Sequence, residues 1–251
     1  MKNHETQNAP GRMFITGSTS GFGEAVARMA AKAGYALVLT GRRADRLKAL
    51  QAELGDAVQH VLCFDVRDRE GTAEAIQRCG VDFIPTVLVN NAGLAVGLEP
   101  ADGVDLDDWD TMVDTNIKGL MYCTRACLPQ MVQNGYGHIV NLGSVAGAYP
   151  YPGGNVYGAT KAFVRQFSLN LRADLVGKNI HVTDVAPGLA NTEFSAVRFK
   201  GDQEKADAVY SGVDPIRAED VADAVYWAAS RPPNININMI EIMAGKQAFN
   251  P

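Results

Sequence analysis

Short apolar runs alternate with amphipathic segments along almost the whole chain. The apolar runs predict buried strands at residues 13–17, 35–41, 60–66, 86–93, 137–144, 179–188 and 236–243. Helical spacing of apolar residues predicts helices at residues 21–33, 43–54, 157–176 and 219–230, and a long helix from Asp107 or Asp108 to Met131. Several strands are unbroken runs of Val, Ile and Leu, which is typical of a parallel sheet with helices on both faces. The pattern therefore predicts an α/β fold with a doubly wound parallel sheet of about seven strands.

No break in composition divides the chain after its first strand. Residues 13–251 contain no linker, repeat or low-complexity segment, which predicts a single domain. The polar stretch MKNHETQNAPGR lacks the apolar segment of a secretion signal, and we expect a flexible tail over residues 1–12.

Composition excludes several classes of protein. The 251 residues carry a net charge of −5 and contain no long basic run, so nucleic-acid binding is not expected. No apolar run approaches the roughly 18 residues of a membrane span. The four cysteines, Cys63, Cys79, Cys123 and Cys127, form no CxxC pair. They are interpreted as reduced core thiols of a cytoplasmic protein, with a metal or redox site as the alternative; no metal is predicted.

A glycine-rich turn follows the first predicted strand. The stretch TGSTSGFG places Gly17, Gly21 and Gly23 between that strand and a helix. Glycines there permit a tight turn and close approach to a pyrophosphate, which the helix N-terminus would bind. The spacing is GxxxGxG instead of the common GxGxxG, and tight packing alone is the other interpretation. The context favours a dinucleotide site.

The end of the second predicted strand indicates which dinucleotide. An NAD site usually has a carboxylate there, but this chain has Gly41 followed by Arg42 and Arg43. Guanidinium groups suit a 2′-phosphate, so the predicted cofactor is NADP. The alternative is that both arginines are solvated charges.

Four further residues suggest proton-transfer chemistry. Tyr157 and Lys161 are four apart and share a helix face, where the ammonium would favour the phenolate. Tyr157 could then protonate a carbonyl or deprotonate an alcohol. Ser144 follows the fifth strand and could hydrogen-bond the reacting oxygen, or be a turn serine. Asn116 lies on an apolar helix face, where it could satisfy backbone groups or hold a water on a path to Lys161.

These motifs together resemble the short-chain dehydrogenase/reductase family. In chain order they are TGSTSGFG, DV at 65–66, NNAG at 90–93, Asn116, Ser144, YGATK at 157–161 and PG at 187–188. The resemblance implies a Rossmann-type sheet in the order 3-2-1-4-5-6-7, a catalytic tetrad of Asn116, Ser144, Tyr157 and Lys161, and a homotetramer or dimer. The cofactor-binding residues that it implies, together with those above, are Gly17, Ser18, Thr19, Ser20, Gly21, Phe22, Gly23, Arg42, Arg43, Asp65, Val66, Asn90, Asn91, Ala92, Gly93, Tyr157, Lys161, Pro187, Gly188 and Thr192.

Three longer stretches resemble one branch of that family. EPADGVDLDDWDTMVDTNIKGL, PGGNVYGATKAFVRQFSLNLR and TEFSAVRFKGD are similar to bacterial NADP-dependent 3-hydroxy acid dehydrogenases, which act on serine, allo-threonine and 3-hydroxypropionate. Sulfoacetaldehyde reductases share much the same motifs. The resemblance implies a small anionic hydroxy acid or semialdehyde as substrate. A broader carbonyl reductase is an alternative; the intact tetrad argues against a non-catalytic NADP-sensing protein.

An anionic substrate needs a cation to hold it. Arg198 is the candidate, because residues after Pro187 and Gly188 form a lid over the cofactor in the family. The other interpretations are a solvated charge or a subunit contact. Tyr149 and Tyr151 could form a wall of the pocket, with Ser144 and Tyr157, or merely pack around prolines. Asn191 stands where close relatives have glycine, which leaves the choice between carboxylate and sulfonate open.

Overall fold

Seven parallel strands form one sheet in the order β3-β2-β1-β4-β5-β6-β7, as the resemblance implied. The computed structural model describes residues 11–80 and 82–248. The strands are β1 (Arg12–Ile15), β2 (Ala36–Gly41), β3 (Val58–Cys63), β4 (Val87–Asn90), β5 (Gly137–Leu142), β6 (Ile180–Pro187) and β7 (Met239–Ile242). The predicted tail lies outside the described residues except for Gly11 and Arg12, and Arg12 is already the first residue of β1.

Helices connect the strands and cover both faces of the sheet. They are α1 (Gly21–Lys32), α2 (Ala44–Leu54), α3 (Arg69–Gln77), α4 (Leu106–Val113), α5 (Leu120–Asn134), α6 (Asn155–Asp174), α7 (Glu193–Arg198), α8 (Gln203–Ala208) and α9 (Ala218–Ala229). Between α4 and α5 the helix continues as a π-helical segment, η2 (Asp114–Gly119). The patterns did not predict α3, α7 or α8.

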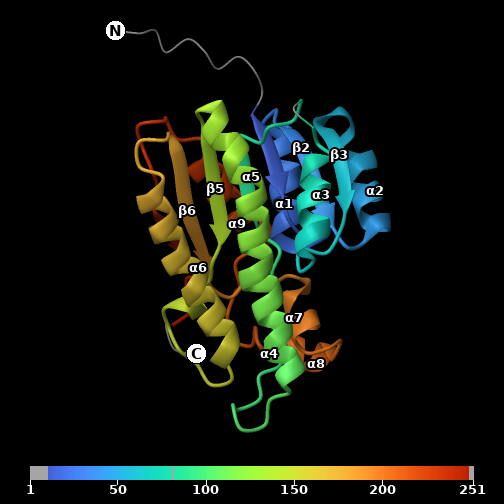
Figure 1. Ribbon diagram of the computed structural model, residues 1–251. Coiled ribbons are helices and arrows are strands. Elements are labelled where there is room, and N and C mark those ends of the chain that lie inside the picture. The colour runs from blue at the N-terminus through green and yellow to red at the C-terminus, as the bar shows by residue number, and fades with distance from the viewer. Residues whose placement is uncertain (1–10, 81, 249–251) are drawn as a thin grey trace.

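The alternation of side chains along the strands creates one core on each face. Met13 and Ile15 of β1 point to the face packed by α1, α2 and α9. Phe14, between them, packs with α3, α5 and α6 on the other face. Figure 1 shows α3, α5 and α6 in front of the sheet and α9 behind it. Because both faces are buried, the strands carry the unbroken apolar runs seen in the sequence.

Several predicted boundaries differ from the structure, and two of the differences have a clear physical reason. The long helix begins after Asp105, whose carboxylate accepts a hydrogen bond from the Asp107 N–H at 3.0 Å. Asp107 and Asp108 lie in the first turn, where acidic residues are also favourable. The residue types alone therefore did not indicate which aspartate precedes the helix. The third strand was predicted at residues 60–66 but spans 58–63, because residues 64–66 leave the sheet and line a cleft.

The interpretation of all four cysteines as core thiols was correct for Cys79, Cys123 and Cys127, which are buried. Burial raises the pKa of the Cys123 thiol to about 12, so it is protonated and unreactive near neutral pH. Cys63 is exposed instead. Across the described residues, no group of three His, Cys, Asp or Glu side chains is placed to hold a metal ion. In the same part of the chain, no helix is long and apolar enough to cross a membrane.

Candidate active site

The predicted phosphate turn lies at the carboxyl end of β1, where the strand order reverses between β1 and β4. In open parallel sheets this reversal opens a crevice for ligands. Gly17 has a φ of 66°, and a Cβ there would lie only 3.0 Å from Ala92 Cα, so a side chain would not fit. Ser20 precedes α1 without forming a side-chain cap, which leaves the first N–H groups of the helix available to an anion.

A long cleft runs from this turn to Tyr157. Most of the predicted cofactor-binding residues line it, namely Gly17, Thr19, Ser20, Gly21, Phe22, Arg42, Arg43, Asp65, Val66, Asn91, Ala92, Gly93, Tyr157, Lys161 and Thr192. Further lining residues that the motifs did not indicate include Phe64, Leu94, Thr115, Glu193 and Phe194. Pro187 and Gly188 line an adjoining cavity instead.

Three further predicted cofactor residues line neither cavity. Ser18 is buried, and its hydroxyl donates to the Thr40 carbonyl at 3.1 Å, which ties the turn to β2. Gly23 faces Gly17 and Asn91 so closely that no side chain could be accommodated, which makes it a packing glycine. The Asn90 amide donates to Thr124 Oγ1 of α5 at 2.8 Å and to Asn141 Oδ1 of β5 at 2.9 Å, on the face of the sheet that α5 covers. These three residues lie beneath the cleft and fix the backbone that forms its wall.

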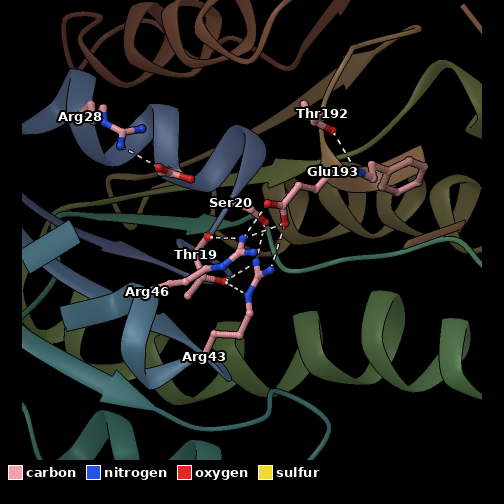
Figure 2. Close-up of polar contacts among 9 residues, drawn as sticks. Thr19, Ser20, Arg28, Arg43, Arg46, Thr192 and Glu193 are labelled. Atoms are coloured by element: carbon pink, nitrogen blue, oxygen red, sulfur yellow. Dashed lines mark hydrogen bonds and ion pairs between the residues drawn. The ribbon is translucent and has the colours of Figure 1, made fainter. Parts of the chain in front are cut away.

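Arginines gather at the far end of the cleft, as the sequence predicted. Arg43 donates from Nε and NH2 to Thr19 Oγ1, at 3.1 and 2.8 Å, and from NH2 to Ser20 Oγ at 2.7 Å. The Arg42 guanidinium lies 3.7 Å from Asp65. Figure 2 shows that Arg43 and Arg46 both turn toward the carboxylate of Glu193, which belongs to α7. The sequence patterns had identified neither Arg46 nor Glu193.

Tyr157 and Lys161 lie on one face of α6 and are both buried. The Lys161 ammonium is 5.9 Å from the centre of the Tyr157 ring and donates to the Leu142 carbonyl at 2.7 Å. Burial lowers the pKa of Lys161 to about 8, against the opposing effect of the Asp184 carboxylate. Burial raises the pKa of Tyr157 to about 12, as does Tyr151, while Ser144 and Arg198 lower it. The phenol is therefore protonated at neutral pH.

Asn116 lies in η2 and is buried. Its Oδ1 accepts from the Leu94 N–H at 2.9 Å, and its Nδ2 donates to the Leu94 carbonyl at 2.8 Å and to Thr160 Oγ1 at 3.0 Å. Of the two roles considered for this side chain, it performs the first, because it satisfies backbone groups of the loop after β4. A Cβ at Gly93 would lie 3.2 Å from Asn116 Oδ1 and 3.6 Å from Lys161 Nζ, so this loop packs directly on both.

Ser144 follows β5, and its backbone begins a short 3-10 turn. Its hydroxyl accepts from the Ala146 N–H at 3.1 Å and donates to the Pro187 carbonyl at 3.3 Å. The same hydroxyl lowers the pKa of Tyr157 through a hydrogen bond. The turn role and the contact with Tyr157 therefore coexist in one side chain.

A second cavity, of about 450 Å³, adjoins Tyr157. All the predicted substrate residues line it: Ser144, Tyr149, Tyr151, Tyr157 and Arg198. Arg198 donates from NH2 to the Tyr151 hydroxyl at 2.8 Å and from Nε to the Gly97 carbonyl at 3.1 Å. Its guanidinium carbon lies 5.4 Å from the Tyr151 ring centre and 5.7 Å from that of Tyr157. Arg198 is thus half-buried in the cavity wall, where its Nε and NH2 nitrogens bind protein groups.

We call residues 193–210, which include α7 and α8, the lid. Residues of α7 line both cavities, and Val209 and Tyr210, which follow α8, line the second. In Figure 1 the two helices lie with α4 beyond the carboxyl ends of the strands. Phe194 of the lid packs against Tyr157, with ring centres 5.6 Å apart. The hydroxyls of Ser195 and Tyr210 are 2.6 Å apart, and Tyr210 donates to the Ala190 carbonyl at 3.0 Å. The lid therefore packs onto Tyr157 while its own hydrogen bonds hold its shape.

Comparisons with known proteins agree with this geometry. The profile of the short chain dehydrogenase family matches residues 12–203. The NADP-dependent 3-hydroxy acid dehydrogenase YdfG of Salmonella typhi is 53% identical over 239 residues, which cover 94% of this chain and 96% of that protein. Serine 3-dehydrogenase of Agrobacterium fabrum is 53% identical over 240 residues, covering 95% and 96%.

Solved structures of serine dehydrogenases share the fold of this chain. The closed form of serine dehydrogenase complexed with NADP+ superposes with a TM-score of 0.92 at 50% identity, over 94% of this chain and 96% of that one. Serine dehydrogenase from Escherichia coli gives a TM-score of 0.84 at 45% identity, over 94% and 99%. The chain belongs to the short chain dehydrogenase family, and it is an oxidoreductase.

Proposed function

We propose that the protein is an NADP-dependent dehydrogenase of small 3-hydroxy acids, such as serine, allo-threonine or 3-hydroxypropionate. The observation that carries this proposal is the position of Arg198, a cation in the wall of a small cavity that also holds Tyr157. The names of the relatives with 53% identity support the same substrate class.

The residues of the cleft fit NADP. Position 17 must be glycine, because a side chain there would collide with the backbone of Ala92. The first N–H groups of α1 are available to a pyrophosphate. Arg43 and Arg46 already hold an anion, the Glu193 carboxylate, which shows that this corner suits negative charge. A carboxylate that would accept a 2′-hydroxyl is missing at Gly41, where NAD enzymes usually have one. When bound, the nicotinamide accepts or supplies the hydride.

The proposed chemistry is a hydride and a proton leaving the same alcohol. In oxidation the substrate would lose a hydride from C3, which bound NADP+ would accept, and its hydroxyl would give its proton to the phenolate form of Tyr157, leaving a C3 carbonyl. In reduction the protonated phenol of Tyr157 would donate that proton back to the carbonyl oxygen. Ser144 hydrogen-bonds the reacting oxygen. Lys161 stabilises the phenolate form of Tyr157 by its charge. Asn116 holds the Leu94 loop that lines the cleft.

Arg198 supplies the selectivity in this proposal. Two of its nitrogens are occupied by Gly97 and Tyr151, whereas NH1 makes no hydrogen bond within the described residues. That nitrogen can bind a carboxylate and orient the substrate with C3 beside Tyr157. Tyr149 and Tyr151 limit the length of the acid, since both line the cavity.

The test is a set of NADPH-dependent reductions by the wild-type protein. Malonic semialdehyde, sulfoacetaldehyde and propanal differ in their anion but hardly in size. We expect the highest kcat/KM for malonic semialdehyde and the lowest for propanal. A preference for sulfoacetaldehyde would reassign the protein as a sulfoacetaldehyde reductase, and a preference for propanal would make it a broader carbonyl reductase.

We also propose a homotetramer in the cytoplasm. The family resemblance supports the assembly, and light scattering after size-exclusion chromatography measures it directly. Fractionation of the source cells tests the location.

A further inference from the structure

The lid is held at both ends of α7. At the carboxyl end, the Gly97 N–H donates to the Arg198 carbonyl at 2.8 Å, and Arg198 Nε donates to the Gly97 carbonyl at 3.1 Å. At the first residue, Glu193 pairs with Arg43 at 3.0 Å and with Arg46 at 2.7 Å. The helix therefore connects the arginine end of the cofactor cleft to the cavity that holds Tyr157.

Hydrogen bonds connect Glu193, through the arginines, to the glycine-rich turn before α1. Arg46 NH1 lies 2.7 and 2.9 Å from the two carboxylate oxygens, and Arg43 NH1 binds one of them. Arg43 is itself fixed by the hydroxyls of Thr19 and Ser20 (Figure 2). The lid is thus connected through Arg43 to the residues that begin α1.

These ion pairs leave room for a cofactor phosphate. A guanidinium has five N–H donors. In the described part of the chain, Nε and NH2 of Arg46 donate no hydrogen bond, and Arg42 only approaches Asp65, at 3.7 Å. The arginines can therefore hold Glu193 and a 2′-phosphate at the same time.

The pairs are also of suitable strength for a moving part. The side chains of Arg43, Arg46 and Glu193 are 38%, 43% and 48% exposed. Exposed ion pairs are weak and sensitive to salt, so a lid held by them can open for ligand exchange. At the other end of α7, the contacts that Arg198 and Phe194 make with Tyr157 would exist only while the lid is closed.

Building on the proposed function, we propose that Glu193 is a positioning residue that holds the lid closed. Its pairing with Arg43 and Arg46 keeps Arg198 and Phe194 over Tyr157 while a dinucleotide occupies the cleft. Glu193 therefore acts through the lid on both cofactor release and substrate placement, without touching the reacting atoms.

The first test needs neither cofactor nor substrate. Arg198 and Lys200 are trypsin sites within the lid. Glu193→Gln keeps the size of the side chain but removes its charge, and Glu204→Gln, on exposed α8 surface, is the matched control. We expect cleavage after Arg198 or Lys200, followed by mass spectrometry, to be roughly three to ten times faster in Glu193→Gln only. High salt should bring the wild type to the same rate.

The second test follows cofactor release by stopped-flow fluorescence. Both NADPH and NADH should leave Glu193→Gln several-fold faster than the wild type. NADH has no 2′-phosphate, so it isolates the lid contact: Arg46→Gln should release NADH as fast as Glu193→Gln, and the double variant no faster than either.

Two results would overturn the proposal. One is unchanged tryptic cleavage and unchanged release in Glu193→Gln. The other is tighter NADPH binding with unchanged NADH binding, because Glu193 would then compete with the phosphate and not hold the lid. The cleavage test is independent of the substrate, so an error in the proposed function would appear in the reductase assays and leave this result intact.

Discussion

The guanidinium carbon of Arg198 lies 5.7 Å from the centre of the Tyr157 ring. The two residues come from different elements, the lid and α6, and they meet over the cavity that adjoins the cofactor cleft. The cation lowers the pKa of the Tyr157 phenol, against the larger effect of burial. In the proposed function, this one side chain would hold the anionic substrate and ease the loss of the tyrosine proton.

Removal of the Tyr157 hydroxyl should strongly reduce turnover and preserve cofactor binding. Tyr157→Phe deletes the proton donor and leaves the ring packed against Phe194. We expect kcat to fall by about 10²–10⁴, the usual contribution of a general acid or base. Fluorescence titration with NADPH should give an unchanged Kd. A rate within a few-fold of the wild type would remove Tyr157 from the proposed mechanism.

Arg43 should decide between NADP and NAD. Its guanidinium is fixed by Thr19 and Ser20 at the end of the cleft. Because a charged hydrogen bond contributes roughly 1.5–3 kcal/mol, Arg43→Gln should weaken NADPH binding by about ten- to a hundredfold. NADH binding should change much less. Arg28→Gln serves as the control, because Arg28 lies further along α1 and forms an ion pair with Glu53 of α2. Equal losses for both cofactors would contradict the assignment.

Asp184 should set the alkaline limit of activity. Burial lowers the pKa of Lys161 to about 8, and the Asp184 carboxylate partly opposes this. Burial raises the pKa of Asp184 itself to about 6, so it is ionised where Lys161 titrates. Asp184→Asn removes the opposing charge, and Lys161 should lose its proton at a lower pH.

The measurement is the pH profile of kcat/KM for the reduction reaction. Its alkaline limb should move down by about one pH unit in Asp184→Asn. Asp174→Asn, at the exposed end of α6, should leave the profile unchanged. An alkaline limb that stays in place in both variants would show that Asp184 does not act on Lys161.

His138 should contribute to loss of stability in acid. Burial lowers its pKa from 6.5 to about 3, with a smaller effect of His181. The unfolded chain therefore binds a proton that the folded protein excludes, so this contribution is complete above pH 6.5 and is lost as the pH falls from 6.5 toward 3.

The check is urea unfolding of His138→Gln, which can keep the hydrogen bond to Thr183. Its free energy of unfolding should fall less steeply than that of the wild type between pH 6.5 and 4, by up to about 1.4 kcal/mol per pH unit. The control is His60→Gln, at a half-buried position on β3. Parallel curves for His138→Gln and the wild type would disprove the linkage.

Local patterns were sufficient to predict the sheet and the shared helix face of Tyr157 and Lys161. The apolar runs predicted all seven strands, and the spacing of Tyr157 and Lys161 placed both on one face of α6. The helix α3 was missed although Asp68 caps it, accepting from the N–H groups of Glu70 and Gly71. Its apolar residues are few and small, so packing on α5 decides its formation more than periodicity does.

Contacts between distant residues could not be predicted in this way. Asn90 matched a cofactor motif, but its side chain binds Thr124 of α5 and Asn141, the residue beside it in β5, on the face of the sheet that α5 covers. Glu193 and Arg46 are separated by 147 positions, and only the folded lid brings them together. Neither residue type nor spacing carries that information.

Arg198→Ala tests the central claim most directly. Steady-state reduction of malonic semialdehyde and of propanal should be compared in this variant and in Lys200→Ala. Lys200 is an exposed lid residue whose side chain pairs with Asp108 of α4. If Arg198 binds the substrate anion, its loss should lower kcat/KM for malonic semialdehyde by about ten- to a hundredfold, mainly through KM. Propanal should be affected little, and Lys200→Ala should change neither. An equal loss for both substrates in Arg198→Ala would contradict the account.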